Sequence, residues 1–142
     1  MNLNEFNSLI DLYFYQANKQ NSKSDFLEWL NPKNKKKFTW GETSSSIYKL
    51  AKMLKENIKD GDRCLLVSEN RPEWLISDIA IMLAGGITVP AYTTYIEKDY
   101  KYLIEDCEPS VIIISNDEMH DKLKNIIEDK PFIRKVISVA IL

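Results

Sequence analysis

The sequence predicts an α/β fold, an open, mostly parallel, doubly wound sheet preceded by an N-terminal helix and a β-hairpin. Three observations carry this prediction. Short apolar stretches rich in β-branched residues alternate with helical patterns from Gly61 onward. Pro72 stands where a helix should begin, and Gly85-Gly86 where the same helix should end. Four such strands with three intervening helices are typical of an open sheet with right-handed connections.

The N-terminal part carries the helix and the hairpin. Residues 4–19 place apolar side chains three and four positions apart, which predicts an amphipathic helix. Residues 26–30 and 38–40 flank a turn rich in Asn, Pro and Lys, which predicts a hairpin. Thr39 and Glu42 then have the spacing of a capping box at the start of a second helix. Its buried stripe should consist of Ile47, Leu50, Ala51 and Leu54, with Gly61 as the stop.

The rest of the chain should form the sheet. Strands are predicted over residues 63–67, 87–89, 111–114 and 136–139. Helices are predicted over residues 74–84, 97–107 and 119–127. The first of these helices is apolar nearly all round, so we expect it to lie between the sheet and a second layer. We therefore expect residues 1–60 to hold the helix, hairpin and first packing helix, and residues 61–142 to form a parallel βαβ half-domain, incomplete at its C-terminus.

Composition narrows the class of protein. A hydrophobic fraction of 44% with 28% charged residues excludes a disordered tail and a membrane protein alike. The formal net charge of −2 gives no general attraction for nucleic acid, so no such partner is expected. The N-terminus lacks the order of a signal peptide, so we expect a cytoplasmic protein. Cys64 and Cys107 should then be reduced, buried thiols and not a disulfide.

Most residues that suggest chemistry have a plainer interpretation. The four glycines compose neither a dinucleotide fingerprint nor a phosphate loop. His120, the sole histidine, lies on a polar stretch of a predicted surface helix. Asn70 and Arg71 follow a strand, and we interpret them as a helix cap and a surface salt bridge instead of ligand groups. Two polar runs are interpreted as solvated, the helical Ser44, Ser45 and Ser46 and the hairpin-tip Lys33, Lys35, Lys36 and Lys37.

Four segments together resemble a known family. They are Phe38-Thr39-Trp40-x-Glu42, Gly61-Asp62-Arg63, Asn70-Arg71-Pro72-Glu73-Trp74 and Ala84-Gly85-Gly86-Ile87-Thr88-Val89-Pro90-Ala91-Tyr92-Thr93-Thr94. Their order and spacing resemble the N-terminal part of adenylate-forming acyl-CoA ligases, and most of all the long-chain fatty acid branch. The resemblance covers about residues 5–139.

The resemblance implies an enzyme that uses ATP and Mg²⁺ to convert a fatty acid to an acyl-adenylate. Coenzyme A then displaces AMP to give the thioester. The family's phosphate loop, acidic motif and mobile lysine do not occur in these 142 residues. We therefore expect an N-terminal fragment that is inactive alone, with no catalytic or metal-binding residue of its own. Its partner would be the missing C-terminal part of the same enzyme.

The resemblance also implies one modest site, at Tyr92, Thr93 and Thr94. In relatives this loop borders the channel that admits CoA, so the threonines would donate hydrogen bonds while Tyr92 packs beneath. The alternative for the loop is a strand end that caps the next helix. The alternative for the whole chain is a small, self-sufficient α/β binding or interaction module. Peripheral membrane contact and self-association through an exposed sheet edge also stay open.

Overall fold

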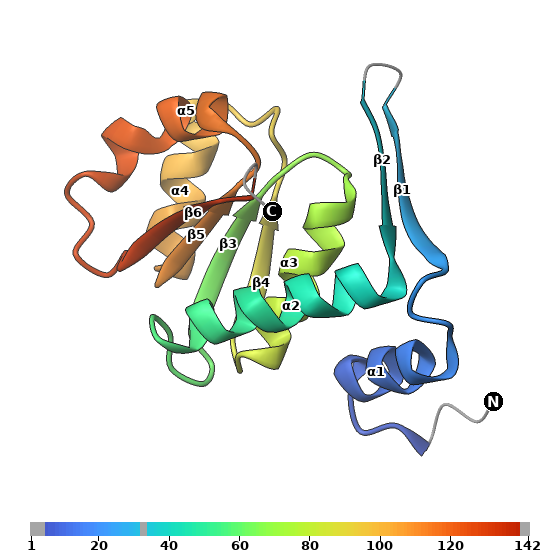
Figure 1. Cartoon of the computed structure of the whole chain (residues 1–142). Coiled ribbons are helices and arrows are strands. Elements are labelled where there is room, and N and C mark those ends of the chain that lie inside the picture. Colours follow the sequence, from blue (N-terminus) through green and yellow to red (C-terminus); the bar gives the residue numbers. More distant parts are fainter. Residues whose placement is uncertain (1–4, 32–33, 140–142) are drawn as a thin grey trace.

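The computed structural model describes residues 5–31 and 34–139 of the chain. The N-terminal elements are α1 (Leu9–Lys19), β1 (Asp25–Asn31), β2 (Asn34–Thr39) and α2 (Trp40–Lys55). The sheet region follows as β3 (Arg63–Val67), α3 (Pro72–Leu83), β4 (Ile87–Ala91), α4 (Glu97–Cys107), β5 (Val111–Ile114), α5 (Asp117–Ile127) and β6 (Lys135–Ser138). Figure 1 shows the hairpin of β1 and β2 standing beside α3, away from β6.

The four-stranded sheet is parallel throughout and has the order β4-β3-β5-β6. Helices cover both faces (Figure 1). Cys64, Leu66 and Ile113 pack with residues of α2 and α3, whereas Leu65 and Ile112 pack with residues of α4 and α5. Because both faces are covered, β5 is buried at every position and shows no polar alternation. The predicted doubly wound fold is confirmed.

Helix α3 packs against α2 and against strands β3 and β4, which agrees with its all-round apolar sequence. Ile76, Ala80 and Ile81 are fully buried. Pro72 occupies the first turn, where the missing N–H costs no hydrogen bond. Gly85 follows the helix with a φ of +87°, a conformation that glycine adopts without strain.

Helix α2 begins at the predicted capping box. Thr39 Oγ1 accepts a hydrogen bond from the Glu42 N–H at 3.2 Å, and the Glu42 carboxylate accepts one from the Thr39 N–H at 2.9 Å. The predicted stripe Ile47, Leu50, Ala51 and Leu54 is buried. The predicted stop is wrong, because the helix ends at Lys55 and Gly61 lies in the later turn before β3.

Two boundaries in the N-terminal part also differ from prediction. Helix α1 begins at Leu9, because the Ser8 hydroxyl caps it by accepting from the Asp11 N–H at 3.1 Å. Trp40 belongs to α2 and not to the hairpin, and its ring stacks on Phe26 with centroids 3.7 Å apart. The predicted helix start at residue 4 lies outside the described residues.

Both cysteines are free, as predicted. Cys64 is buried in β3, and burial raises its pKa to about 12. Cys107 is only half-buried at the end of α4, and burial raises its pKa as well. Within residues 5–31 and 34–139, no helix combines the length and apolar character needed to cross a bilayer.

Candidate functional site

The carboxyl ends of β3 and β4 open into a cleft. The chain leaves β3 for α3 on one face of the sheet and leaves β4 for α4 on the other, and such diverging loops leave a crevice that commonly binds ligands. Here the crevice has a volume of about 630 Å³, and we call it the sheet-edge cleft. It is lined by Ser68, Glu69, Asn70 and Trp74 from one side and by Pro90, Ala91, Tyr92, Thr93 and Thr94 from the other.

The loop that follows β4 is braced through its carbonyl groups. Tyr100 Oη donates to the Tyr92 carbonyl oxygen at 2.7 Å, and Lys122 Nζ donates to the Thr93 carbonyl oxygen at 3.3 Å. Burial raises the pKa of Tyr100, which keeps its phenol protonated and able to donate. The Tyr95 N–H closes a turn onto the Tyr92 carbonyl at 3.2 Å. Hydrogen bonds to the carbonyl oxygens of Tyr92 and Thr93 therefore hold the backbone of this loop in place.

The side chains of this loop are left available for a ligand. In the described part of the chain, no hydrogen bond engages the hydroxyl of Thr93 or Thr94. The alternative role as a helix cap is wrong, because α4 is capped at Ile96, whose N–H donates to the Asp99 carboxylate at 3.2 Å. Tyr92 does not pack beneath the loop, since it is 71% exposed.

The structure corrects the interpretation of Asn70, which lines the opposite side of the sheet-edge cleft, and of its neighbour Arg71. Asn70 does not cap α3, because the cap position belongs to Arg71 and carries no side-chain cap. Arg71 does form the expected salt bridge, with Nε 2.8 Å from Glu73 Oε2 and Nη2 3.0 Å from Oε1. However, Glu73 is fully buried, so this ion pair lies inside the protein and not on its surface.

The buried carboxylate also reaches the hairpin. Lys36 Nζ on β2 lies 3.2 Å from Glu73 Oε1. Burial, the largest single influence, raises the pKa of Glu73, but hydrogen bonds from Arg71 and Lys36 and the Arg71 charge hold the pKa below its usual value. Lys36 is therefore not a merely solvated tip residue. Lys37 pairs with Asp25 at 2.7 Å, and Lys33 lies outside the described residues.

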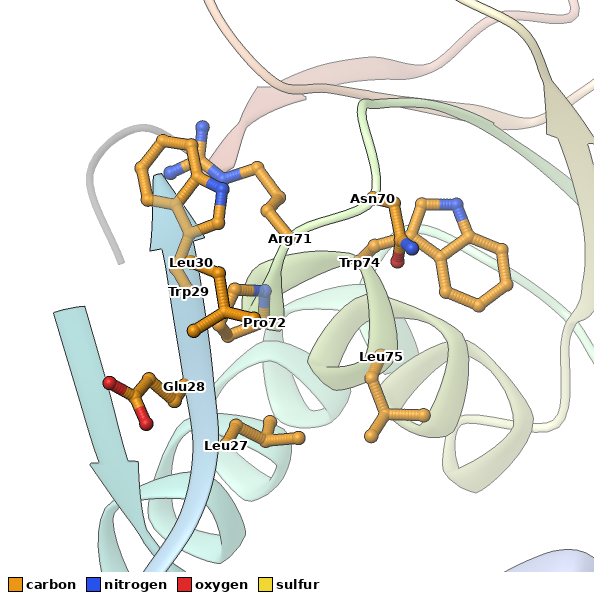
Figure 2. A pocket seen from close by; sticks show the side chains of 9 residues that line it. All are labelled: Leu27, Glu28, Trp29, Leu30, Asn70, Arg71, Pro72, Trp74 and Leu75. Carbon is orange, nitrogen blue, oxygen red and sulfur yellow. The ribbon is translucent and has the colours of Figure 1, made fainter. Parts of the chain in front are cut away.

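A second cleft lies between the hairpin and α3, and Figure 2 shows its lining. Its volume is about 610 Å³, and we call it the hairpin groove. It is lined by Leu27, Glu28, Trp29 and Leu30 of β1 and by Asn70, Arg71, Pro72, Trp74 and Leu75. The Arg71 guanidinium lies over the Trp29 ring, 4.7 Å from its centroid. Asn70 and Trp74 line both clefts, so one wall separates them.

Other candidates from the sequence stay apart from both clefts. His120 is exposed on α5. Ser44 is half-buried, and its hydroxyl shares a hydrogen bond of 3.1 Å with Tyr13, so it is not simply solvated. Among the residues that the structure describes, no group of three or more His, Cys, Asp or Glu side chains could hold a metal ion.

Comparison with known proteins identifies the family. The AMP-binding enzyme family matches residues 14–142. The chain belongs to this family. The long-chain-fatty-acid–CoA ligase FadD15 of Mycobacterium tuberculosis is 30% identical over 83 residues, which cover 58% of this chain and 14% of that protein. The long-chain-fatty-acid–CoA ligase ACSBG1 of Rattus norvegicus is 29% identical over 109 residues, which cover 72% of this chain and 15% of that protein. The chain thus matches about one-seventh of the length of these relatives.

Solved structures of ligases share the fold. The anthranilate CoA ligase AuaEII in complex with anthranoyl-AMP superposes with a TM-score of 0.82 at 19% identity, over 99% of this chain and 27% of that chain. A fatty acyl-adenylate ligase from L. pneumophila, in complex with acyl adenylate and pyrophosphate, superposes with a TM-score of 0.75 at 22% identity. The superposition covers 94% of this chain and 23% of that chain. The resemblance to adenylate-forming ligases and the predicted fold are both confirmed.

Sequence reasoning misses the hairpin groove and the ion-pair cluster beside it. The sequence pattern predicts a hairpin over residues 26–40 and solvent exposure for Lys36, and it gives Glu73 no role. One signal is available, because Trp29 and Lys36 are cross-strand partners in a hairpin and therefore share a face. The sequence offers no way to place that face against α3.

Proposed function

We propose that this chain is the N-terminal portion of an ATP-dependent, AMP-forming long-chain fatty acid–CoA ligase. The family match over residues 14–142 carries the proposal, and the ligases FadD15 and ACSBG1 among its relatives support the acyl class. The whole enzyme would join a fatty acid to ATP, giving acyl-adenylate and pyrophosphate. The CoA thiol would then attack the acyl carbonyl and release AMP.

In this proposal the sheet-edge cleft borders the path of CoA. Thr93 and Thr94 offer hydroxyl groups that no other described residue engages, on a loop that Tyr100 and Lys122 brace. An amide or hydroxyl of the pantetheine arm could accept or donate there. ATP and Mg²⁺ would be held by the remainder of the enzyme, and we expect the chain alone to lack turnover. We expect the enzyme to work in the cytoplasm.

The β4 edge supports a larger assembly. Ile87 is 52% exposed on β4, which forms one edge of the described sheet, and two more large hydrophobic side chains are exposed in the chain that follows this strand, Tyr92 by 71% and Ile96 by 64%. Apolar side chains that gather at the edge of a sheet commonly form a contact surface for another part of the protein. We therefore propose residues 61–142 as a half-domain that another part of the enzyme covers. In its absence, self-association through this edge is the expected consequence.

A chimera tests the proposal. The long-chain-fatty-acid–CoA ligase of Bacillus subtilis is 35% identical over 79 residues, so its matching N-terminal segment can be replaced by this chain. With palmitate, ATP and CoA, the chimera should release pyrophosphate and form palmitoyl-CoA, whereas this chain alone should do neither. Pyrophosphate release by the chain alone would contradict the expected inactivity. A folded chimera that leaves palmitate unchanged but activates another carboxylic acid would contradict the acyl class.

The same chimera tests the cleft. Thr93→Ala together with Thr94→Ala should raise the KM for CoA severalfold and leave the KM for ATP unchanged, because only the CoA path passes this loop. Thr88→Ala on β4, the strand that precedes this loop, is the control, since Thr88 does not line the cleft. An unchanged KM for CoA in the double variant would remove Thr93 and Thr94 from the proposed site.

A further inference from the structure

We propose that Tyr100 and Lys122 are positioning residues for the sheet-edge cleft. They orient two backbone N–H groups of the loop after β4, those of Thr93 and Thr94, towards the cleft, where these groups serve as donors to a ligand. That this ligand is CoA rests on the proposed function. The orientation of the loop rests on the structure alone.

The loop after β4 separates two cavities. The sheet-edge cleft lies on one side of it, where Trp74 of α3 forms part of the opposite wall. On its other side lies a crevice of about 500 Å³, lined by residues of the loop, of α4 and of α5. Thr94 lines both cavities. Because there is space on both sides, packing alone does not fix the backbone of the loop, and its hydrogen bonds decide where it lies.

Two helices on one face of the sheet supply these hydrogen bonds. Tyr100 Oη on α4 donates to the Tyr92 carbonyl oxygen at 2.7 Å, and Lys122 Nζ on α5 donates to the Thr93 carbonyl oxygen at 3.3 Å. Tyr100 is 1% exposed and belongs to the core between the sheet and these helices, so packing fixes its hydroxyl. Both carbonyl groups therefore point towards α4 and α5, away from α3.

The planar peptide bond passes this orientation on to the next residue. In a trans peptide the C=O group and the following N–H group point in opposite directions, and both of these peptides are trans. The N–H groups of Thr93 and Thr94 therefore point to the α3 side, where the sheet-edge cleft lies. Within the described part of the chain, neither of them donates a backbone hydrogen bond. Successive N–H groups in a turn are a donor pair that suits a carbonyl or anionic oxygen.

Tyr100→Phe tests the first positioning residue in the chimera, because it removes one hydroxyl and keeps the ring in the core. The KM for CoA should rise about three- to tenfold, whereas kcat at saturating CoA and the KM for ATP should change less than about twofold. Tyr102→Phe makes the same change on α4 at a side chain that is 69% exposed, and it should leave the KM for CoA unchanged. An unchanged KM for CoA in Tyr100→Phe, or equal rises in the two variants, would overturn the proposal.

Lys122 is tested with a matched pair of variants. Its side chain is 42% exposed, so Lys122→Met should raise the KM for CoA by only about two- to threefold. Lys122→Arg retains a donor and should restore most of the affinity. Glu118 lies 3.3 Å from the Lys122 ammonium, and Glu118→Gln removes this partner without touching the loop, so the KM for CoA should not change. Equal losses in Lys122→Met and Lys122→Arg, or in Lys122→Met and Glu118→Gln, would overturn the role of Lys122.

The orientation of the loop can be measured on this chain alone, without turnover. The ¹⁵N backbone order parameters of Thr93 and Thr94 should fall in Tyr100→Phe and stay unchanged in Tyr102→Phe, because only the first change frees the Tyr92 carbonyl. Unchanged order parameters in Tyr100→Phe would overturn the proposal, even if the chimera forms palmitoyl-CoA and the proposed function stands. Lower order parameters together with a folded but inactive chimera would support the positioning role and remove its link to CoA.

Discussion

Replacing Glu73 by Gln would test how the hairpin is held against α3. The carboxylate is fully buried and accepts hydrogen bonds from Arg71 at 2.8 and 3.0 Å and from Lys36 at 3.2 Å. Gln has the same volume, but it turns one acceptor into an NH₂ donor that faces a guanidinium. It also leaves two cations without their counter-charge. The perturbation is therefore electrostatic, with little change in packing.

The burial of the ion pair sets the expected loss in the free energy of unfolding. Removing one partner of a buried ion pair costs roughly 3–5 kcal/mol. Arg71 is only 12% exposed, whereas Lys36 is 45% exposed and partly screened by water. We therefore expect the lower end, about 3 kcal/mol, which lowers the melting midpoint of a chain of this size by about 6–12 °C. Lys36→Met is the matched control. It removes only the outer hydrogen bond and should cost about 1 kcal/mol or less.

Urea unfolding followed by far-UV circular dichroism measures both variants under the same conditions. A loss smaller than about 1 kcal/mol for Glu73→Gln would refute the reasoning, because a single ordinary hydrogen bond would explain it. A loss in Lys36→Met equal to that in Glu73→Gln would also refute it. In that case the lysine, and not the arginine pair, would hold the buried carboxylate.

The same carboxylate predicts a dependence on pH. The folded-state pKa of Glu73 lies below its usual value, so its stabilising contribution is fully present above the ordinary glutamate pKa of about 4.3. The contribution is lost as pH falls through the lower, folded-state pKa. The free energy of unfolding should therefore decrease on acidification less steeply in Glu73→Gln than in the unmodified chain. Parallel acid curves for the two would contradict this assignment.

Two further predictions concern the sheet region. Gly85→Ala should cost about 1–2 kcal/mol of stability because its φ is +87°, and more than Gly61→Ala, where φ is +85° but an added Cβ meets nothing. At Gly85 the Asp60 carboxylate must also move, so equal losses in urea unfolding would contradict the steric part. Cys107 should react with iodoacetamide before Cys64, because Cys64 is buried with a pKa of about 12 and the thiolate is the reactive form. Equal labelling rates in the native chain, read by peptide mass spectrometry, would contradict that order.

The sheet could be predicted because its determinants are local. A run of β-branched residues such as Val111–Ile114 has no polar face, so it must be covered on both sides, and a parallel sheet provides that cover. Thr39 and Glu42 interact within one turn, so their spacing alone predicts the cap. The errors at Gly61 and Trp40 are errors of boundary. There, a turn and a tertiary ring contact with Phe26 override the local pattern.

Glu73 shows what the sequence could not provide. Charged residues are mostly exposed, so the sequence predicts that any salt bridge of Arg71 lies on the surface. Two residues of the distant hairpin take part in this cluster, since Lys36 donates to the buried carboxylate and Trp29 stacks on Arg71. No spacing rule links those positions. Burial of a charge requires partners on more than one element, and only the packed structure supplies them.

The loop after β4 shows the same limit at the candidate site. From the sequence, Thr93 and Thr94 suit a helix cap as well as a ligand contact, because threonine hydroxyls serve both roles. The structure decides against the cap through a residue further on, since Asp99 already accepts the hydrogen bond from the Ile96 N–H. Once α4 is capped without them, two threonine hydroxyls remain without a partner in the described chain, at the edge where parallel strands gather their ligands. Their role therefore depends on what enters the cleft, and the CoA dependence of the double threonine variant measures it.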